Sequence, residues 1–326
     1  MHSKVLSVKS HFVEKRNFYS LLGKVIITAG LITFIITKIN FSQAAAGIKG
    51  ADSFYIVLCC MFMFLNIYLQ YLKWKLACIK ILNIYDRKKI FNSLFFGFAG
   101  GAFTPARLGE YWGRSIALKD KPFLLVSAAT IIDKIFPLII IIISGIIFSI
   151  PFMILITGNQ NPGYVYALSI IFALVSLILF GVFFKIKPEK IYSFIEKTRF
   201  VKKHPELMGI IRAPDKKFFS KMLLISMTVY GCYIFQYALL TIAFSDNQHI
   251  LKYMWAGILV MFTKAVLVPF SLTELGIREG ASAYFLSLLG ESAAAGFNAA
   301  LFLFLINIIV PSLFGLLLML TRKNGK

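Results

Sequence analysis

The chain is poor in the residues that bind metals or form crosslinks. Among its 326 residues, four are cysteine and four are histidine. The cysteines show no CxxC spacing, and the histidines are scattered without any pair at i and i+4. Closely spaced ligands of these types are what a structural or catalytic metal site requires. We therefore expect unpaired cysteines, no metal site and no cofactor.

Acidic residues are also scarce, since 14 aspartates and glutamates stand against 35 lysines and arginines, for a formal net charge of +21. In a soluble protein this balance would indicate nucleic-acid binding. However, 59% of the residues are apolar and the mean hydropathy is +0.79, whereas a soluble domain has roughly 45–50% apolar residues. We therefore predict an integral membrane protein that does not bind nucleic acid.

Continuous apolar runs come close to the ~20 residues that a helix needs to cross the hydrocarbon core. Seven such runs are present, at residues 21–37, 54–72, 135–156, 164–184, 222–244, 253–268 and 299–320. They do not alternate apolar and polar residues as the strands of a membrane β-barrel do. The pattern predicts an all-α fold, a polytopic helical bundle that forms a single membrane domain over residues 1–326.

Basic residues gather in alternate connections between these runs. The basic segments are the N-terminal segment 1–20, the connection 73–90, the loop 185–221 and the tail 321–326. By contrast, the connection 157–163 carries no charge. Because cationic loops stay on the cytoplasmic side, we expect a multi-pass protein of the cytoplasmic (inner) membrane with both termini in the cytoplasm. A basic surface that also gathers anionic lipid headgroups is an open alternative.

Two stretches, residues 91–121 and 268–290, interrupt the apolar pattern with charges, glycines and a proline. The positions concerned are Pro105, Arg107, Gly109, Glu110 and Arg114 in the first stretch and Pro269, Glu274, Gly276, Arg278 and Glu279 in the second. Ionisable groups within a membrane are costly unless paired or hydrated, so they indicate a functional site. Interrupted segments in corresponding halves of a chain are typical of transporter binding sites.

The two stretches are expected to pass the membrane differently. The first is too short for two full crossings, so we predict a re-entrant hairpin or a broken helix that faces the interior of the bundle. For the tail to end in the cytoplasm, the second stretch must cross outward, so we predict an interrupted crossing between residues 271 and 289.

The spacing of acids and bases in both stretches allows ion pairs within a helix. A helix that begins near Pro105 would place three charges on one face, those of Arg107, Glu110 and Arg114. Glu274 and Arg278 are also four residues apart. One interpretation is a structural ion pair that joins broken helices. The other is an arginine that holds the phosphate of a lipid during its passage, and both roles are compatible.

Three further charges lie within apolar sequence. Lys264 either extends toward the cytoplasmic interface or faces the second stretch. Asp133 and Lys134 are expected to mark the inner end of a helix, and the alternative is that they join the cluster around Glu110. These positions stay open on the sequence alone.

The pattern Pro105-x-Arg107-x-Gly109-Glu110 with Arg114, followed by Pro269 and then Gly276-x-Arg278-Glu279, resembles the flippase-like membrane domain of the lysylphosphatidylglycerol synthases. The similarity extends over nearly the whole chain. The resemblance implies an all-helical membrane domain that moves or binds lipids such as aminoacylated phosphatidylglycerol or polyprenyl-linked glycans. It also implies a site made of Pro105, Arg107, Gly109, Glu110, Arg114, Pro269, Gly276, Arg278 and Glu279.

The chain departs from the family pattern in three ways. Thr273-Glu274-Leu275 precede Gly276 where small glycines are common, and Lys134 stands where arginine is common. Six residues follow Leu320, so we expect the chain to lack the aminoacyl-transferase domain of the synthases. We therefore do not expect this chain to aminoacylate lipids by itself.

The expected function is that of a lipid flippase or lipid transporter for a phosphate-bearing lipid, whether anionic, aminoacylated or polyprenyl-linked. Two alternatives stay open. One is a membrane-embedded transferase that uses a polyprenyl-phosphate donor, which would need acidic residues as base or metal ligands. The other is a non-catalytic partner of a lipid or glycan synthesis complex. Expected partners are membrane lipids, and a homo-oligomer or a synthase partner is possible.

Overall fold

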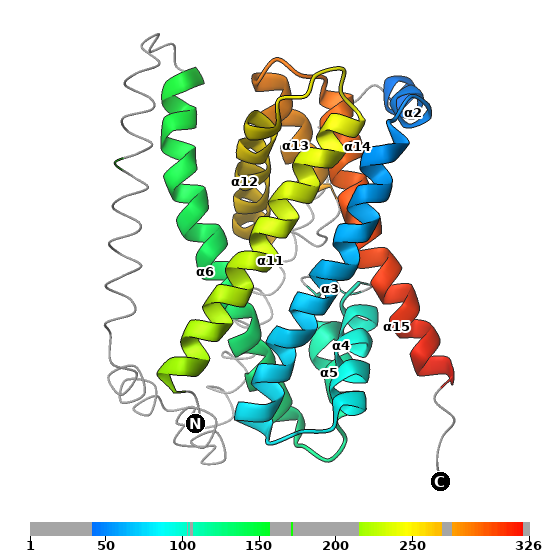
Figure 1. Ribbon diagram of the computed structural model, residues 1–326, viewed down its shortest axis with the longest axis vertical. Coiled ribbons are helices and arrows are strands. Elements are labelled where there is room, and N and C mark those ends of the chain that lie inside the picture. Colours follow the sequence, from blue (N-terminus) through cyan, green and yellow to red (C-terminus); the bar gives the residue numbers. More distant parts are fainter. Residues whose placement is uncertain are drawn as a thin grey trace, which may run out of the picture.

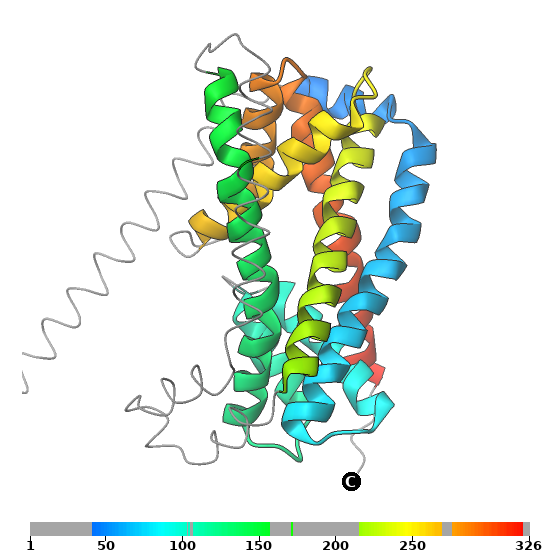
Figure 2. The ribbon, with the colours of Figure 1, turned by 60° about the vertical axis from the view of Figure 1, so that its left-hand side comes forward.

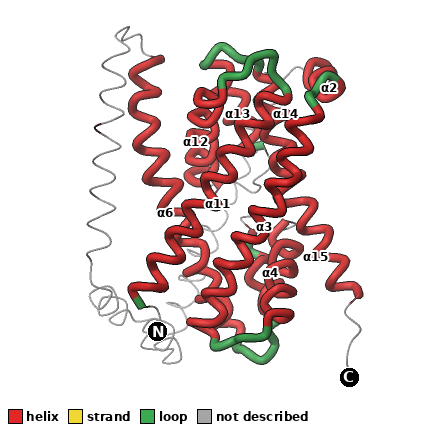
Figure 3. Tube along the Cα trace, viewed as in Figure 1, coloured by secondary structure: helices red, strands yellow, loops and turns green. Residues whose placement is uncertain are grey.

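The computed structural model describes residues 41–102, 104, 107–156, 171, 215–268 and 276–321. Within these ranges the regular structure is entirely helical, with no strand. Most helices follow the long axis of the bundle, as Figure 1 shows, and the longer loops lie at its two ends (Figure 3). The prediction of an all-α polytopic membrane bundle is confirmed. The apolar runs 21–37 and 164–184 lie outside the described residues.

Five helical segments of the described part are long and apolar enough to cross a membrane. They are α3 (Ser53–Leu82), α6 (Phe123–Ile156), α11 (Lys216–Ala243), α12 (Ile250–Leu267) and the continuous run of α14 (Ala293–Phe304), η3 (Leu305–Ile309) and α15 (Val310–Thr321). Charged residues cap two of these helices: the carboxylate of Asp52 accepts a hydrogen bond from Phe54 N, and that of Asp215 accepts one from Phe218 N. Such caps satisfy backbone donors that the helix itself leaves open.

The predicted loop 73–90 is largely helical. Helix α3 continues to Leu82, and α4 (Arg87–Ala102) begins five residues later, so only a short turn connects them. Lys73 therefore lies within α3, where it is 6% exposed. A lysine can be buried in a helix when a carboxylate faces it, and Asp133 of α6 supplies that carboxylate.

Both charged stretches form helical hairpins that enter the bundle from opposite ends (Figures 1 and 2). In the first, α4 is followed by α5 (Gly109–Ala117), and Lys89 at the start of α4 pairs with Asp120 just after α5. In the second, α12 is followed by α13 (Ile277–Leu288), and Lys252 in the first turn of α12 pairs with Glu291 just after α13 at 2.7 Å. Each hairpin thus returns to the end where it began.

Three helices of these hairpins, unlike α12, are too short to cross the hydrocarbon core alone. At a rise of 1.5 Å per residue, the 16, 9 and 12 residues of α4, α5 and α13 span only about 24, 14 and 18 Å of a hydrocarbon core of about 30 Å. The first stretch forms a helical hairpin, and the prediction that it is a re-entrant hairpin or a broken helix in the membrane stays a prediction. The crossing predicted between residues 271 and 289 stays a prediction, because its first part lies outside the described residues and the described part, α13, has 12 residues.

The two ends of the bundle differ in charge. The end at which α4 and α11 begin, here called the basic end, carries exposed or half-exposed basic residues at Arg87, Lys88, Lys89, Lys119, Lys121, Lys216 and Lys217. The opposite end carries Lys49 in the short helix α2 (Phe41–Lys49) and the paired Lys252, together with the acids Asp52, Asp246 and Glu291.

Two apolar clusters form the core. The first lies toward the basic end, around Trp74 and Phe98, and the second lies toward the opposite end, around Tyr237 and Leu286. The buried amides of Asn66 and Gln236 hydrogen bond with each other at 3.5 Å in the middle of the bundle. The interior therefore contains uncharged polar groups beside the apolar clusters.

Glycines let α4 and α5 approach backbone to backbone. A Cβ atom added to Gly113 would overlap the carbonyl oxygen of Phe96, and one added to Gly109 would overlap that of Gly100. Small residues at helix contacts are the usual means of close packing in membranes. The tip of the first hairpin is therefore held by direct backbone contact.

Replacing Gly113 by alanine should lower the thermal stability of the purified protein, because crowding of a packed contact costs about 1–3 kcal/mol. The matched control is Gly231→Ala, since a Cβ atom at Gly231 meets no atom within 4 Å. Melting curves in detergent would compare the two variants with the wild type. Equal melting temperatures for Gly113→Ala and Gly231→Ala would contradict the packing argument.

Candidate functional site

The tip of the first hairpin differs from the prediction. Helix α5 begins at Gly109, not near Pro105, and Pro105 lies outside the described residues. The hydroxyl of Thr104 accepts a hydrogen bond from Gly109 N at 2.7 Å and so fixes the helix start. Arg107 precedes the helix with a φ of 57°. This left-handed conformation costs an arginine roughly 1–2 kcal/mol, so the surrounding structure holds the residue in place.

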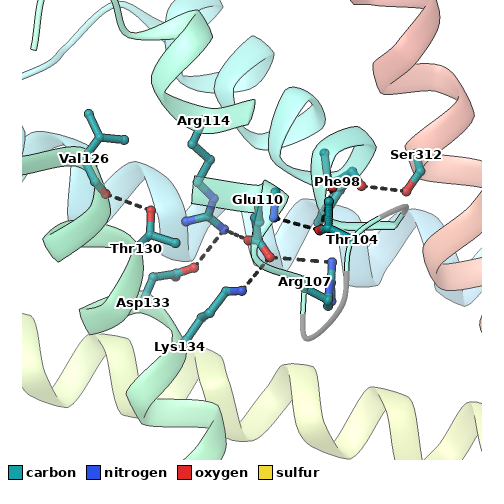
Figure 4. A network of polar contacts seen from close by, with 12 residues as sticks. Phe98, Thr104, Arg107, Glu110, Arg114, Val126, Thr130, Asp133, Lys134 and Ser312 are labelled. Carbon is teal, nitrogen blue, oxygen red and sulfur yellow. Dashed lines mark hydrogen bonds and ion pairs between the residues drawn. The ribbon is translucent and has the colours of Figure 1, made fainter. Parts of the chain in front are cut away.

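Glu110 lies at the centre of a group of cations (Figure 4). Its Oε1 accepts a hydrogen bond from Arg114 Nη2 at 2.5 Å. Its Oε2 lies 2.8 Å from Lys134 Nζ and 3.8 Å from Arg107 Nη2. Thus the three charges predicted to share a helix face do come together, although Arg107 approaches from outside the helix.

Asp133 extends this group to two further helices. Its Oδ2 accepts a hydrogen bond from Arg114 Nη2 at 3.0 Å, and its Oδ1 lies 3.3 Å from Lys73 Nζ. Asp133 lies ten residues inside α6, so the expectation that it marks a helix end is wrong. The alternative is confirmed, since both Asp133 and Lys134 join the cluster around Glu110.

The resulting network, here called the cationic cluster, has more positive than negative charges. It contains four basic residues, Lys73, Arg107, Arg114 and Lys134, and two acidic ones, Glu110 and Asp133. The side chains of Lys73, Glu110, Arg114 and Asp133 are each less than a tenth exposed, whereas Arg107 and Lys134 are 25% and 32% exposed. The accessible part of the cluster is therefore cationic.

Aromatic rings cover part of the cationic cluster. The guanidinium carbon of Arg114 lies 3.9 Å from the centre of the Trp74 ring, and Lys134 Nζ lies 5.1 Å from that of Tyr111. Such contacts stabilise a cation where water is excluded. The sequence interpretation missed Lys73 and Trp74, because both lie on α3, far from the motif along the chain.

The second hairpin carries one tight ion pair at the start of α13. Gly276 has a φ of 92°, which favours glycine, and its N–H donates to Glu279 Oε2 at 2.8 Å. Arg278 Nη2 donates to Glu279 Oε1 at 2.5 Å, and both side chains are buried. The guanidinium carbon of Arg278 lies 5.0 Å from the centre of the Phe304 ring. Glu279 therefore both caps the helix and neutralises Arg278.

Three other predicted positions belong to this hairpin. Pro269 and Glu274 lie outside the described residues, and the predicted pair of Glu274 with Arg278 therefore stays a prediction. Lys264 lies in the last turn of α12 and is half-buried. This turn is where α12 ends, beside α6 and partway along the bundle (Figure 2).

A short row of hydrogen-bonded amides lies between the cationic cluster and Arg278. Gln70 lies one turn before Lys73 on α3. Its Nε2 donates a hydrogen bond to Asn66 Oδ1 at 2.9 Å. Asn66 Nδ2 in turn lies 3.3 Å from Asn307 Oδ1. Asn307 lies in the π-helix η3, one turn after Phe304, whose ring contacts Arg278. The polar residues of α3 thus extend from the cationic cluster toward the helix that contacts Arg278.

Tyr233 of α11 lies near both motifs. Its hydroxyl lies close enough to Arg107, to Arg278 and to the amide of Gln70 to interact with each of them electrostatically. The arginines of the two hairpins therefore approach one tyrosine, although they are separated by more than half of the chain.

Glu291 lies just after α13, at the end of the bundle opposite the basic end. Burial raises its pKa, but hydrogen bonds from Lys252 and Asn247 outweigh this effect and hold the pKa below its ordinary value. The charged carboxylate ties the loop after α11 to the turn after α13 at the opposite end of the bundle. It closes the base of the second hairpin.

Fold and site together define a multi-pass helical membrane protein in which two helical hairpins carry buried ion pairs. The family model described as the lysylphosphatidylglycerol synthase TM region matches residues 21–315, so the chain belongs to this family. The match confirms the resemblance found in the motifs and associates the protein with lipid metabolism or transport. No curated protein matches the chain significantly.

Replacing Asp133 by alanine should strongly destabilise the protein, because it leaves Lys73 and Arg114 buried with one carboxylate fewer. Removing one partner of a buried ion pair typically costs about 3–5 kcal/mol. The control is Asp120→Ala, which removes an exposed carboxylate that pairs with Lys89 at the surface and should change stability little. Melting temperatures in detergent that fall equally in both variants would contradict the assignment.

Proposed function

We propose that this protein binds a phosphate-bearing lipid and moves it across the cytoplasmic membrane, with the polar headgroup passing between the tips of the two hairpins. The observation that carries the proposal is the cationic cluster, in which four basic residues share two carboxylates inside a membrane bundle. Membership of a lipid-associated family supports the same function.

The accessible charges suit a phosphate. Arg107 is one quarter exposed, and its guanidinium presents several N–H donors in a plane that matches phosphate oxygens. The ammonium of Lys134, on the other side of Glu110, is also partly accessible. A phosphate between them would receive charge-assisted hydrogen bonds in a region of low dielectric constant, where such bonds are strong.

The charge of the bundle ends supports an orientation. Because basic loops remain in the cytoplasm, we place the basic end on the cytoplasmic side. The C-terminal helix α15 ends at the same side as the start of α4, as Figure 1 shows. In this orientation the first hairpin enters from the cytoplasm, the second enters from outside, and α15 ends on the cytoplasmic side; the basic segment 1–20 supports a cytoplasmic N-terminus as well.

The opposed hairpins suggest how access could alternate. Each hairpin carries an arginine near its tip and is anchored at its base by an ion pair, Lys89 with Asp120 or Lys252 with Glu291. Displacement of the first tip would expose the interior to the cytoplasm, and displacement of the second would expose it to the outside. A headgroup bound between the tips would then change sides without an open pore.

The charges favour transport over the transferase alternative. Glu110, Asp133 and Glu279 each contact an arginine or a lysine, and these contacts keep the carboxylates engaged. A carboxylate that serves as a base or binds a divalent metal needs a free lone pair directed at its substrate or ion. The acids of the two motifs act instead as counter-charges for the basic residues.

Proteoliposomes with acyl-labelled phosphatidylglycerol would test the proposal by measuring how quickly an external quencher gains access to the label of the inner leaflet. Wild-type protein should accelerate the exchange. Arg107→Ala and Arg278→Ala should each slow it by about ten- to a hundredfold, because the loss of a charge-assisted hydrogen bond costs about 1.5–3 kcal/mol.

The control for these variants is Arg87→Ala, which removes an exposed arginine at the basic end. It should leave the exchange rate unchanged. The proposal fails if wild-type vesicles exchange lipid no faster than empty ones, or if all three arginine variants behave alike.

A further inference from the structure

Two uncharged polar residues, Gln70 and Tyr233, lie between the cationic cluster and Arg278 and are both half-buried. We propose that they form a hydrogen-bonding subsite for hydroxyl groups of the lipid headgroup, so that the preferred lipid combines a phosphate with an uncharged, hydroxyl-bearing group. The inference rests on the proposed function, because it concerns the same headgroup.

The position of Gln70 follows from the polar face of α3. Asn66, Gln70 and Lys73 follow one another at i, i+4 and i+7, and therefore share one face of the helix. Lys73 belongs to the cationic cluster, whereas Asn66 holds the amide of Gln70 through its Oδ1 at 2.9 Å. Gln70 is thus one turn away from the charges, and its orientation is set by a buried neighbour.

The position of Tyr233 follows from a stripe of hydroxyl groups on α11. Ser226, Tyr230, Tyr233 and Tyr237 lie at i, i+4, i+7 and i+11. The Tyr230 hydroxyl hydrogen bonds with Ser144 of α6 at 2.8 Å, and that of Tyr237 hydrogen bonds with Ser282 of α13 at 2.7 Å. The stripe therefore faces the interior between α6 and α13, and Tyr233 lies at its centre.

The buried amides of Asn66 and Asn307 hold Gln70 in place. Asn66 Nδ2 lies 3.3 Å from Asn307 Oδ1, and Asn307 Nδ2 donates to Leu303 O at 3.3 Å. Asn307 is in the π-helix η3, and π-helices within a helix often mark functional sites. A fixed row of amides keeps Gln70 oriented before any ligand binds, which lowers the entropic cost of binding.

The chemistry of these groups suits a hydroxyl. An amide offers both a donor and an acceptor, and the tyrosine hydroxyl can also do both, so a headgroup hydroxyl can donate to one and accept from the other. The Tyr233 hydroxyl also interacts with Arg107 and Arg278, which places the subsite beside the expected phosphate. A site that hydrogen bonds a hydroxyl rejects an analogue that lacks it.

The same geometry disfavours a headgroup that carries an amine. Glu110 already contacts three basic residues, Asp133 contacts two, and Glu279 is paired with Arg278. An ammonium placed here would meet like charges while the described carboxylates of both motifs are engaged. Like-charge contact of this kind is a strong source of specificity.

The experiment compares three acyl-labelled lipids in proteoliposomes: phosphatidylglycerol, phosphatidic acid and lysyl-phosphatidylglycerol. Wild-type protein should move phosphatidylglycerol fastest. Gln70→Leu and Tyr233→Phe should each slow the transport of phosphatidylglycerol by about tenfold, because a lost hydrogen bond of about 1.4 kcal/mol corresponds to a factor of ten. The transport rate of phosphatidic acid, which lacks the hydroxyl-bearing group, should not change. By contrast, Arg107→Ala should slow both lipids.

The matched control is Tyr68→Phe, since Tyr68 lies on α3 two residues before Gln70 and is 57% exposed. It should affect none of the lipids. A wild type that does not prefer phosphatidylglycerol, or Gln70 and Tyr233 variants that slow all lipids equally, would overturn the inference while the proposed function stands.

Native mass spectrometry of the purified protein separates the two proposals further. If no lipid moves, the proposed function fails, and competition between phosphatidylglycerol and phosphatidic acid for binding still tests the subsite. Preferential retention of phosphatidylglycerol that is lost in Tyr233→Phe supports it. Equal retention of both lipids overturns it. Melting curves of each variant show whether it is folded.

Discussion

The ion pairs of Glu110 and Asp133 with Arg114 are the interaction on which the rest of the site depends. Arg114 reaches both carboxylates through one nitrogen, Nη2, and thereby joins α5 to α6, while Lys73 adds α3. Burial of these charges is tolerable only because each has an opposite charge within contact distance. The network keeps a short helix of nine residues, too short to be stable by itself, at a defined place in the bundle.

Strain and close packing are concentrated at the same hairpin. Arg107 adopts a left-handed conformation, and the backbones of α4 and α5 meet at Gly100 and Gly109. Strained residues persist where the surrounding structure over-determines them, and such places cluster at functional sites. In the second hairpin the corresponding strained position is filled by Gly276, so the two tips reach a similar break in the helix by different means.

The sequence allowed the membrane fold, the family and the two motifs to be predicted, because apolar runs and Gly-x-Arg-Glu patterns are local signals. It did not allow Lys73 to be recognised as a site residue, since a lysine in a basic connection has the same local pattern whether it is exposed or buried. The roles of Gln70 and Asn66 were likewise hidden, because their partners Tyr233 and Asn307 become neighbours only through packing. Helix boundaries at Gly109 depended on the Thr104 hydroxyl contact, which spacing alone does not specify.

The π-helix η3 has a mechanical consequence. A π-helix has about one residue more per turn than an α-helix, so η3 rotates the side chains of α15 around the helix axis relative to those of α14. Helix α14 packs against α11 and α13, whereas α15 packs against α4. A single continuous rod therefore touches both hairpins, one with each of its halves. If this continuous helix bent at η3, α13 and α4 would therefore shift in a coordinated way.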